Sequence, residues 1–295
     1  MKTEAAVGFV LSLLCVTSVS ADDASPPGAY DRTRGESSIG TSAPTRQQMV
    51  NAIKNATPTR LYATLEYGER VECFECIPGL TEKLLSSNDA EVREISAWWL
   101  RRRSFGFGPV MAKMQRVAHE DADPVRRARA ASALGEFLDP HGAETLSTLA
   151  RSDADATVRV AAVRALGRLN TLSAHAGLSS ALHDTDPQVR LAALQQVLKV
   201  NFFADMDSLL GLLGDADVQV RNLAVQLTGE LRLTAASDAL LGVLMTDDSV
   251  RVRQSAAIAL GHIGGVDAGE ALSDAMTVEK DSAVQDAISI ARRMR

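Results

Sequence analysis

Two cysteines separated by two residues are the first side chains in this sequence that could do chemistry. Cys73 and Cys76 form a Cys-x-x-Cys motif. Such a motif can close a local disulfide, supply half of a metal site, act as a redox centre or remain as free thiols. The sequence has no second cysteine pair to complete a metal site and no βαβ pattern of a thioredoxin-like protein. We therefore predict a structural disulfide between Cys73 and Cys76 and keep the other interpretations open.

Histidine and glutamate side chains could hold a metal, but their spacing does not form a ligand set. His119 and Glu120 are adjacent, and one such pair cannot supply the several ligands that a metal needs. The sequence also has no phosphate-binding glycine loop, no Gly-x-Ser-x-Gly and no His-Glu-x-x-His. We therefore predict no catalytic site, no metal site and no cofactor.

A run of aromatic and basic residues is the most unusual stretch of the chain. Two tryptophans precede three arginines and two Phe-Gly pairs. These residues either fill a gap beside the helical array or form a recognition patch, because Trp and Arg often dominate binding at protein interfaces. Two further arginines occupy positions that we expect on the exposed inner face of the array. The candidate partner-binding residues are Trp98, Trp99, Arg101, Arg102, Arg103, Phe105, Phe107, Arg129 and Arg164.

The elements that must position these residues repeat along the chain. An Asp followed four or five residues later by Arg recurs, and successive arginines lie 31 to 34 residues apart. Each period holds two helical stretches, which is typical of a helical repeat array. A degenerate seventh copy runs from Asp281 to Gln285. The six full pairs are Asp89 and Arg93, Asp123 and Arg127, Asp155 and Arg159, Asp186 and Arg190, Asp217 and Arg221, and Asp248 and Arg253.

The residue types within each period indicate how the repeat is built. Asp accepts hydrogen bonds from the free amides at the start of the second helix, and Arg four residues later can pair with it along one helix face. Because each Arg lies about one repeat from the next, we also expect an Asp–Arg ladder along the stack. Gly135, Gly167, Gly229 and Gly261 are predicted to end second helices as C′ glycines.

The pattern Asp-x-x-Val-Arg-x-x-Ala-Ala-x-Ala-Leu-Gly, most complete at residues 155–167, resembles the HEAT-like repeats of the phycobilisome-lyase type. The resemblance covers about residues 80–295. It implies an all-α fold, a right-handed α-solenoid (an α-α superhelix), in a class whose members are mostly scaffolds. The deoxyhypusine hydroxylase branch resembles this chain in period, but its di-iron ligands are His-Glu pairs just after the anchor Arg. This sequence has no such pair there.

The N-terminal residues are typical of an export signal. Lys2 precedes an apolar run that ends in small residues before Ala21, and a stretch rich in Ser, Pro, Gly and Asp follows. We therefore predict a signal peptide at 1–21, a disordered linker at 22–44, an N-terminal helical cap at 45–79 and the repeat array at 80–295. Retention of residues 1–21 as an anchor is the alternative. Export places the protein in the periplasm or outside the cell.

The overall charge narrows the choice of partner. The formal net charge of −6 argues against nucleic-acid binding, which depends on neutralising phosphates. It gives no reason to expect membrane binding after removal of the signal peptide. We therefore predict an extracytoplasmic scaffold that binds another protein on the concave face of the array. The alternative is an exported redox enzyme, a metal-dependent oxidoreductase of the deoxyhypusine hydroxylase kind, or an enzyme accessory.

Overall fold

The described part of the chain is helical throughout. The computed structural model describes residues 43–103, 106–201 and 203–294, and the regular elements in these ranges are all helices. The all-α fold expected from the sequence is therefore confirmed. The predicted signal peptide lies outside the described residues, as do nearly all of the predicted linker and the candidate residue Phe105.

The helices follow one another as pairs. The first helices are α1 (Arg46–Asn55), α3 (Cys76–Ser86), α5 (Phe107–Glu120), α7 (Ala143–Ser152), α9 (Leu172–Leu182), α11 (Met206–Gly211), α13 (Ser237–Thr246) and α15 (Gly265–Val278). The second helices are α2 (Pro58–Tyr67), α4 (Ala90–Arg101), α6 (Pro124–Glu136), α8 (Ala156–Leu169), α10 (Pro187–Val197), α12 (Val218–Glu230), α14 (Val250–Ile263) and α16 (Ser282–Ala291). Short 3-10 helices η3 (Pro140–Gly142), η4 (Leu212–Gly214) and η5 (Thr234–Ala236) lie next to α7, α11 and α13.

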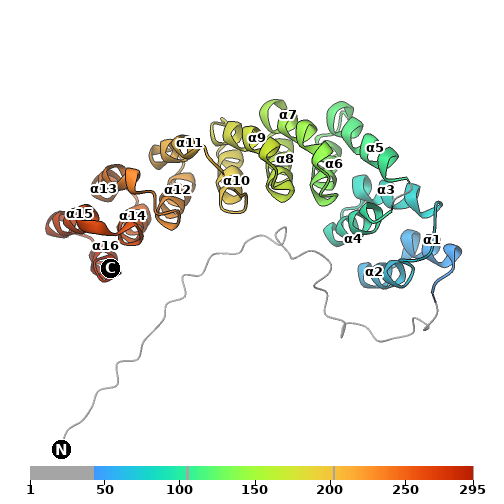
Figure 1. The fold of residues 1–295 in the computed structure, drawn as a ribbon, viewed down its shortest axis with the longest axis horizontal. Coiled ribbons are helices and arrows are strands. Elements are labelled where there is room, and N and C mark those ends of the chain that lie inside the picture. The colour runs from blue at the N-terminus through green and yellow to red at the C-terminus, as the bar shows by residue number, and fades with distance from the viewer. Residues whose placement is uncertain (1–42, 104–105, 202, 295) are drawn as a thin grey trace, which may run out of the picture.

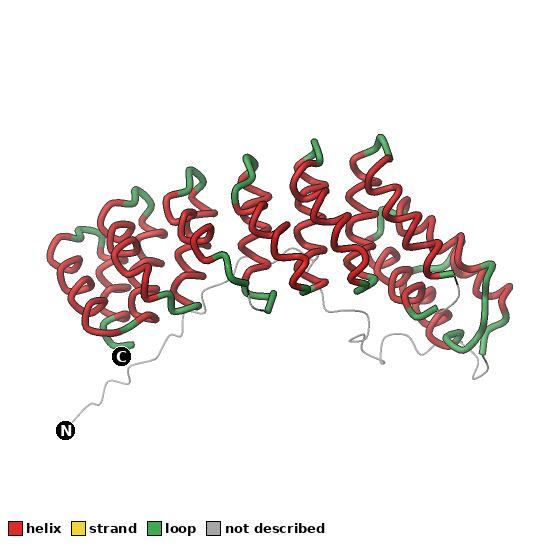
Figure 2. The backbone as a smooth tube through the Cα atoms, turned by 45° about the horizontal axis from the view of Figure 1, so that its top comes forward, coloured by secondary structure: helices red, strands yellow, loops and turns green. Residues whose placement is uncertain are grey.

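The pairs stack side by side into an arch, which confirms the predicted solenoid (Figure 1). The first helices form the outer row and the second helices line the inner, concave side. Second helices of successive pairs pack on one another, most extensively α6 on α8, α12 on α14 and α14 on α16. Figure 2 shows the same succession of pairs from another angle, with the connecting loops at the two edges of the stack.

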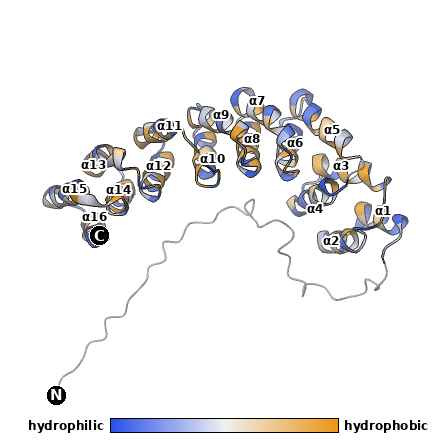
Figure 3. Ribbon diagram, in the orientation of Figure 1, coloured by the Kyte–Doolittle hydropathy of each residue, from blue (hydrophilic) through white to orange (hydrophobic). Residues whose placement is uncertain are grey.

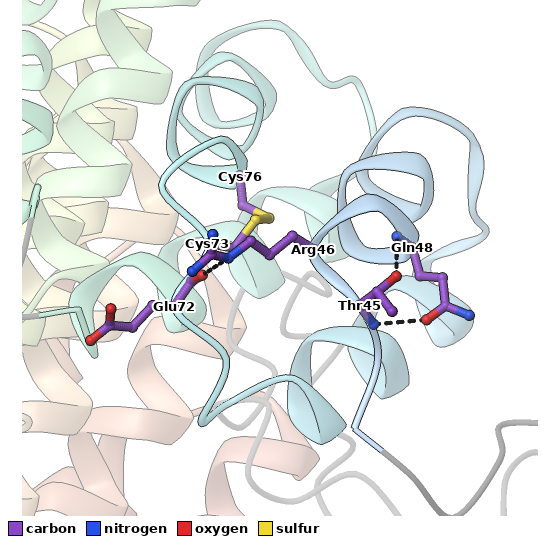
Figure 4. Close-up of a disulfide and its surroundings, with 6 residues drawn as sticks. All are labelled: Thr45, Arg46, Gln48, Glu72, Cys73 and Cys76. Atoms are coloured by element: carbon purple, nitrogen blue, oxygen red, sulfur yellow. Dashed lines mark hydrogen bonds between the residues drawn. A yellow bond between two sulfur atoms is a disulfide. The ribbon is translucent and has the colours of Figure 1, made fainter.

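The predicted helical cap has the same construction as the pairs that follow it. Its helix α1 packs on α3 and its helix α2 packs on α4. Thr45 begins α1 through a capping box with Gln48, in which each side chain bonds the other residue's backbone amide (Figure 4). Because α3 begins at Cys76, the predicted end of the cap at residue 79 falls inside that helix. The structure thus continues the stack through the cap.

The core is built from small and branched aliphatic side chains, as the composition suggests. In α8, Ala162, Val163 and Leu166 are each fully buried. One continuous apolar cluster runs from Met49 to Ala291, and apolar and polar residues alternate around the helices along the arch (Figure 3). Burying a side chain such as Leu166 contributes roughly 1.5–3 kcal/mol. Each pair obtains most of this burial from its neighbours, because the stack is only two layers thick.

Four glycines of the second helices have a different role from the predicted one. Gly135 and Gly229 lie inside α6 and α12 and do not follow them. A Cβ at Gly229 would stand 2.6 Å from Cα of Ala259 in the next second helix, and one at Gly135 would stand 2.7 Å from Cα of Ala165. The C′ prediction for the four glycines is therefore wrong: Gly167 and Gly261 also lie within their helices, α8 and α14. The missing side chain lets the neighbouring backbone approach closely at Gly135, Gly229 and Gly261, and at Gly167 it makes room for the Gln196 side chain.

Candidate functional site

A ladder of salt bridges connects successive pairs along one edge of the stack. Each ladder arginine lies in the first turn of a second helix and binds a carboxylate just before the next second helix. For example, Nε and Nη2 of Arg159 donate to the two carboxylate oxygens of Asp184 at 2.7 and 2.9 Å. Among the described residues, such bridges join Arg127 to Asp153, Arg159 to Asp184, Arg190 to Asp215, Arg221 to Asp247 and Arg253 to Glu279.

The same side chains also bind the backbone, which fixes their geometry. Nη1 of Arg159 donates to the carbonyl oxygen of Asp153 at 2.9 Å. The Asp184 carboxylate, already bound to Arg159, accepts the amide of Asp186 at 2.8 Å. Only 12% of the Arg159 side chain and 9% of the Asp184 side chain are exposed. Since every polar group of the rung is paired, its burial costs little and holds adjacent pairs in register.

The predicted partner of each ladder arginine is wrong, although the arginines themselves do form a ladder. Asp89, Asp123, Asp155, Asp186 and Asp217 are N-caps that accept hydrogen bonds from first-turn amides of their own helices. This bonding turns each carboxylate toward its helix end and away from the Arg four residues later. Asp248 is not a cap, because Ser249 takes that position in α14. The pairing carboxylate is the acidic residue two positions before the cap.

The first predicted arginine, Arg93, lies at the start of this series. Its Nη1 donates to the carbonyl oxygen of Ser87 at 2.9 Å, as the later arginines do to the residue at the same position. In this first copy the position holds Ser87, whose hydroxyl accepts the amide of Asp89. Ser87 stands where the later copies carry an acidic residue, so the turn is kept but this position offers no carboxylate.

Hydrogen bonding shifts the pKa values of the ladder groups. Burial raises the pKa of Asp153 and of Asp247, but hydrogen bonds from Arg127 and Arg221 outweigh it, and both pKa values lie below the ordinary range. The hydrogen bond from Arg253 lowers the pKa of Glu279 in the same way. All three carboxylates are therefore charged at neutral pH.

A groove on the concave side is the first candidate binding site. It encloses about 900 Å³ and is lined by side chains of α4, α6, α8 and α10. Apolar residues such as Val125, Ala128, Val160 and Ala161 form part of its floor. Charged side chains lie among them: the basic ones are Arg93, Arg129, Arg164, Arg168 and Lys199, and the acidic ones are Glu94, Glu136 and Asp186.

Two of the predicted partner-binding residues, Arg129 and Arg164, line this groove. Arg129 donates to the carbonyl oxygen of Leu85 at 3.0 Å and to Oδ1 of Asn88 at 2.8 Å. It is thereby held across the junction between α3 and α6 by neutral acceptors. Arg168, which the sequence did not single out, forms a salt bridge with Glu136 across the groove floor. The concave surface therefore presents charged groups that are fixed in position.

The two tryptophans do not form a surface patch. Trp98 and Trp99 are 6% and 1% exposed, and the ring of Tyr62 in α2 lies 5.2 Å from that of Trp98. Phe107 packs edge-on against Phe137 at 5.2 Å. These rings fill the junction between the first two pairs and the array. This corrects the recognition-patch interpretation for Trp98 and Trp99, because a buried ring offers no surface to a partner.

The three consecutive arginines lie around these rings. Arg101 donates to the carbonyl oxygen of Glu136 at 2.9 Å, and Arg102 pairs with Glu69 at 2.5 Å. The guanidinium groups of Arg102 and Arg103 lie 5.0 and 3.9 Å from the ring centres of Trp98 and Trp99. The predicted residues 98–103 thus form one cluster, and Arg129 and Arg164 belong to the separate groove.

Cys73 and Cys76 form a disulfide at the start of α3 (Figure 4). Both residues are buried. In the adjacent turn, Arg46 of α1 donates from Nε to the carbonyl oxygen of Glu72 at 2.7 Å. The disulfide therefore joins the connection between the first two pairs to the helix that begins the second pair.

The described residues offer no group of three or more His, Cys, Asp and Glu side chains that could hold a metal ion. Nor does any helix in the described ranges have the length and apolar character of a membrane span. The site in this part of the chain is therefore a surface of fixed charges and small apolar side chains.

The stacked helix pairs and the concave groove define a helical-repeat protein of the α-solenoid class. The family model of HEAT repeats matches residues 112–199 and 206–291, which is more than half of the chain. The chain therefore belongs to the HEAT repeat family. No curated protein matches its sequence at a significant level.

Several solved structures are similar to this chain. YibA of Escherichia coli is 16% identical, with a TM-score of 0.51 over 85% of this chain and 93% of that chain. The CpcE–CpcF complex of phycocyanin lyase from Nostoc sp. PCC7120 is 20% identical, with a TM-score of 0.40 over 73% and 93%. Human deoxyhypusine hydroxylase is 20% identical, with a TM-score of 0.36 over 84% and 96%. At 16% identity, the likeness to YibA shows a common fold and does not transfer a function.

Proposed function

We propose that this protein is an extracytoplasmic scaffold that binds another protein in the groove of α4, α6, α8 and α10. The observation that carries the proposal is the groove itself, an open concave volume of about 900 Å³ lined by four consecutive second helices. Stacked repeats use such extended concave surfaces for binding. The groove also combines apolar floor residues with fixed charges, which suits a protein segment of mixed character.

Two features support the extracytoplasmic part of the proposal. The N-terminal residues have the composition of a signal peptide, and the disulfide between Cys73 and Cys76 suits an oxidising compartment. Fractionation of producing cells, with mass spectrometry of the N-terminus, tests this part. We expect a mature chain that begins at Asp22 and is found outside the cytoplasm. An intact N-terminus in the cytoplasmic fraction would contradict it.

A charge reversal in the groove tests the binding part. Arg164 lines the groove, whereas Arg151 is exposed on α7 of the outer row. We expect Arg164→Glu to abolish cross-linking of the partner to the groove, and the matched variant Arg151→Glu to leave it unchanged. A photo-cross-linker at Val160 reports contact with the groove directly. Equal cross-linking of both variants would show that Arg164 does not contribute to binding, and the absence of any cross-link from Val160 would show that the partner binds elsewhere.

The enzymatic alternative gains no support from the described residues. The two cysteines are joined to each other, and no metal-holding cluster occurs in the part of the chain that the structure describes. The scaffold is therefore the function that the geometry favours.

A further inference from the structure

A small pocket lies beside the disulfide, apart from the concave groove. Its volume is about 250 Å³, and its lining includes Arg70, Arg102 and Arg103 together with Trp99 and the Cys73 end of the disulfide. The residues come from the connection between α2 and α3 and from the end of α4. The pocket thus gathers three cationic side chains in a volume that suits a single small group.

Three hydrogen-bond donors at this pocket have no acceptor within the described residues. They are Nε1 of Trp99 and Nε and Nη2 of Arg103, and all three atoms are buried. Trp99 itself is 1% exposed. A buried donor without a partner costs free energy, so native proteins rarely leave three together. Since all three groups donate, the missing partner must be an acceptor.

The guanidinium group of Arg103 is held by its other nitrogen, Nη1, and the edge formed by Nε and Nη2 is buried without a partner among the described residues. Its Nη1 donates to the carbonyl oxygen of Glu69 at 2.5 Å, and its Cζ atom lies over the Trp99 ring, 3.9 Å from the ring centre. The remaining edge, formed by Nε and Nη2, presents two parallel N–H groups. That edge matches the two oxygens of a carboxylate.

The charges around the pocket also favour an anion. Its cations are Arg70, Arg102 and Arg103, and the carboxylates nearby are those of Glu72, which lines the pocket, and Glu69, which pairs with Arg102. Burial lowers the pKa of Arg103, Glu69 raises it, and the charge of Arg102 lowers it again. A bound anion would offset both the burial and the repulsion from Arg102.

We propose that this pocket binds a carboxylate group, with the Nε–Nη2 edge of Arg103 as a bidentate donor and Nε1 of Trp99 as a third donor. The carboxylate belongs either to a small organic acid or to a peptide, since both carry the same group. The volume admits one carboxylate and the few atoms that carry it. The proposal does not depend on the concave groove.

The indole N–H resonances give a direct test, because Trp98 and Trp99 are the only tryptophans in the chain. The purified protein with its disulfide intact is labelled with ¹⁵N and titrated with sodium succinate at constant ionic strength. We expect the Trp99 indole resonance to shift and saturate, because its N–H acquires an acceptor. The Trp98 resonance serves as an internal control, since Trp98 does not line the pocket. Succinamide, the neutral diamide of succinate, should produce no saturable shift.

Variants at the pocket distinguish a specific site from general charge attraction. Arg103→Lys keeps the charge and removes the planar fork, and we expect it to weaken succinate binding by at least about tenfold. Arg101→Lys, which changes an arginine outside the pocket lining, should leave the affinity unchanged. Trp99→Phe removes the third donor, and its weaker binding is measured by calorimetry. Thermal unfolding of each variant shows whether it is folded.

A second titration separates the two sources of the carboxylate. Trialanine with a free C-terminus and the same peptide with an amidated C-terminus are compared with succinate. Tighter binding of the free peptide assigns the pocket to a peptide end, and tighter binding of succinate assigns it to a small acid. The proposal is overturned if both indole resonances drift without saturation, if inorganic phosphate binds more tightly than every carboxylate, or if folded Arg103→Lys binds as the native protein does.

Discussion

At the scale of single residues, two aspartates that lie only two positions apart have different bonding roles. Asp184 receives two hydrogen bonds from Arg159 of the preceding pair, whereas Asp186 caps its own helix through the amide of Gln188. The sequence alone assigned the pairing to the cap residue. The sequence does not distinguish the two aspartates, because both are acidic and both precede a helix. Which of them pairs with the arginine depends on where the neighbouring repeat places its guanidinium group.

These different bonding roles predict different losses of stability when each aspartate is replaced by alanine. Asp184→Ala leaves the nearly buried Arg159 without its carboxylate, so we expect a loss of about 3 kcal/mol in the free energy of unfolding. Asp186→Ala removes only a helix cap and should cost about 1 kcal/mol. Urea denaturation followed by circular dichroism measures both. Equal costs would mean that the ladder adds nothing beyond the helix cap.

The ladder carboxylates also predict the response to acid. The pKa values of Asp153, Asp247 and Glu279 lie below the ordinary values of 3.8 for Asp and 4.5 for Glu. A lowered pKa in the folded state stabilises the protein above the unfolded value, and this stabilisation is lost as the pH falls through the folded value. We therefore expect constant ladder stabilisation from about pH 5 to 8 and a decline below about pH 4.5.

Urea midpoints at pH 7, 5 and 3 measure this decline. Asp153→Asn, which cannot ionise, serves as the control and should lose less stability between pH 5 and pH 3 than the native protein does. A native protein that is more stable at pH 3 than at pH 5 would contradict the assignment.

At the scale of the helices, local signals were predicted well and contacts between repeats were not. The caps at Asp123 and Asp155 begin α6 and α8 as expected, because capping involves only adjacent residues. The role of Gly229 was missed, because its reason lies in the next helix. The buried positions of Trp98 and Trp99 could not be told from exposed ones by residue type, since aromatic residues serve both in cores and in interfaces.

Two glycines in helices should respond in opposite ways to the same substitution. Gly229→Ala places a methyl group 2.6 Å from Cα of Ala259, and we expect a loss of about 1–3 kcal/mol from overpacking. Gly242 lies in α13, where an added Cβ would meet no atom within 4 Å, so Gly242→Ala should stabilise by roughly 0.5–1 kcal/mol. Denaturation midpoints give both signs. A gain in stability for Gly229→Ala would show that the two backbones are not in close contact.

At the scale of the whole molecule, stability is expected to be local, because each pair touches only its neighbours. The periodicity of the sequence predicted this architecture, since repeated apolar patterns require stacked partners. The groove could not be located in the same way. Its lining combines residues from four pairs, and the curvature that brings them together arises from small rotations that no single repeat encodes.

The disulfide tests this locality. The loop that it closes is only a few residues long, so the double variant Cys73→Ser with Cys76→Ser should lose at most about 2 kcal/mol. Because the bond lies between the first two pairs, we expect faster hydrogen exchange in α1 to α4 and unchanged exchange in α12 to α16. Hydrogen-exchange mass spectrometry resolves these segments. Faster exchange throughout the chain would show that the stack unfolds as a single unit.

The position of the ladder also has a mechanical consequence for the arch. Its rungs lie at the turns between the first and second helices of the pairs, and each is clamped both to a carboxylate and to a backbone carbonyl. These turns occupy one edge of the stack, so that edge resists stretching. Bending should therefore occur about the row of arginines, and the spacing between pairs should change mainly at the opposite edge. A protein that enters the groove would then change the distance between the two ends of the arch, because small changes in the angle between successive pairs add up along the stack.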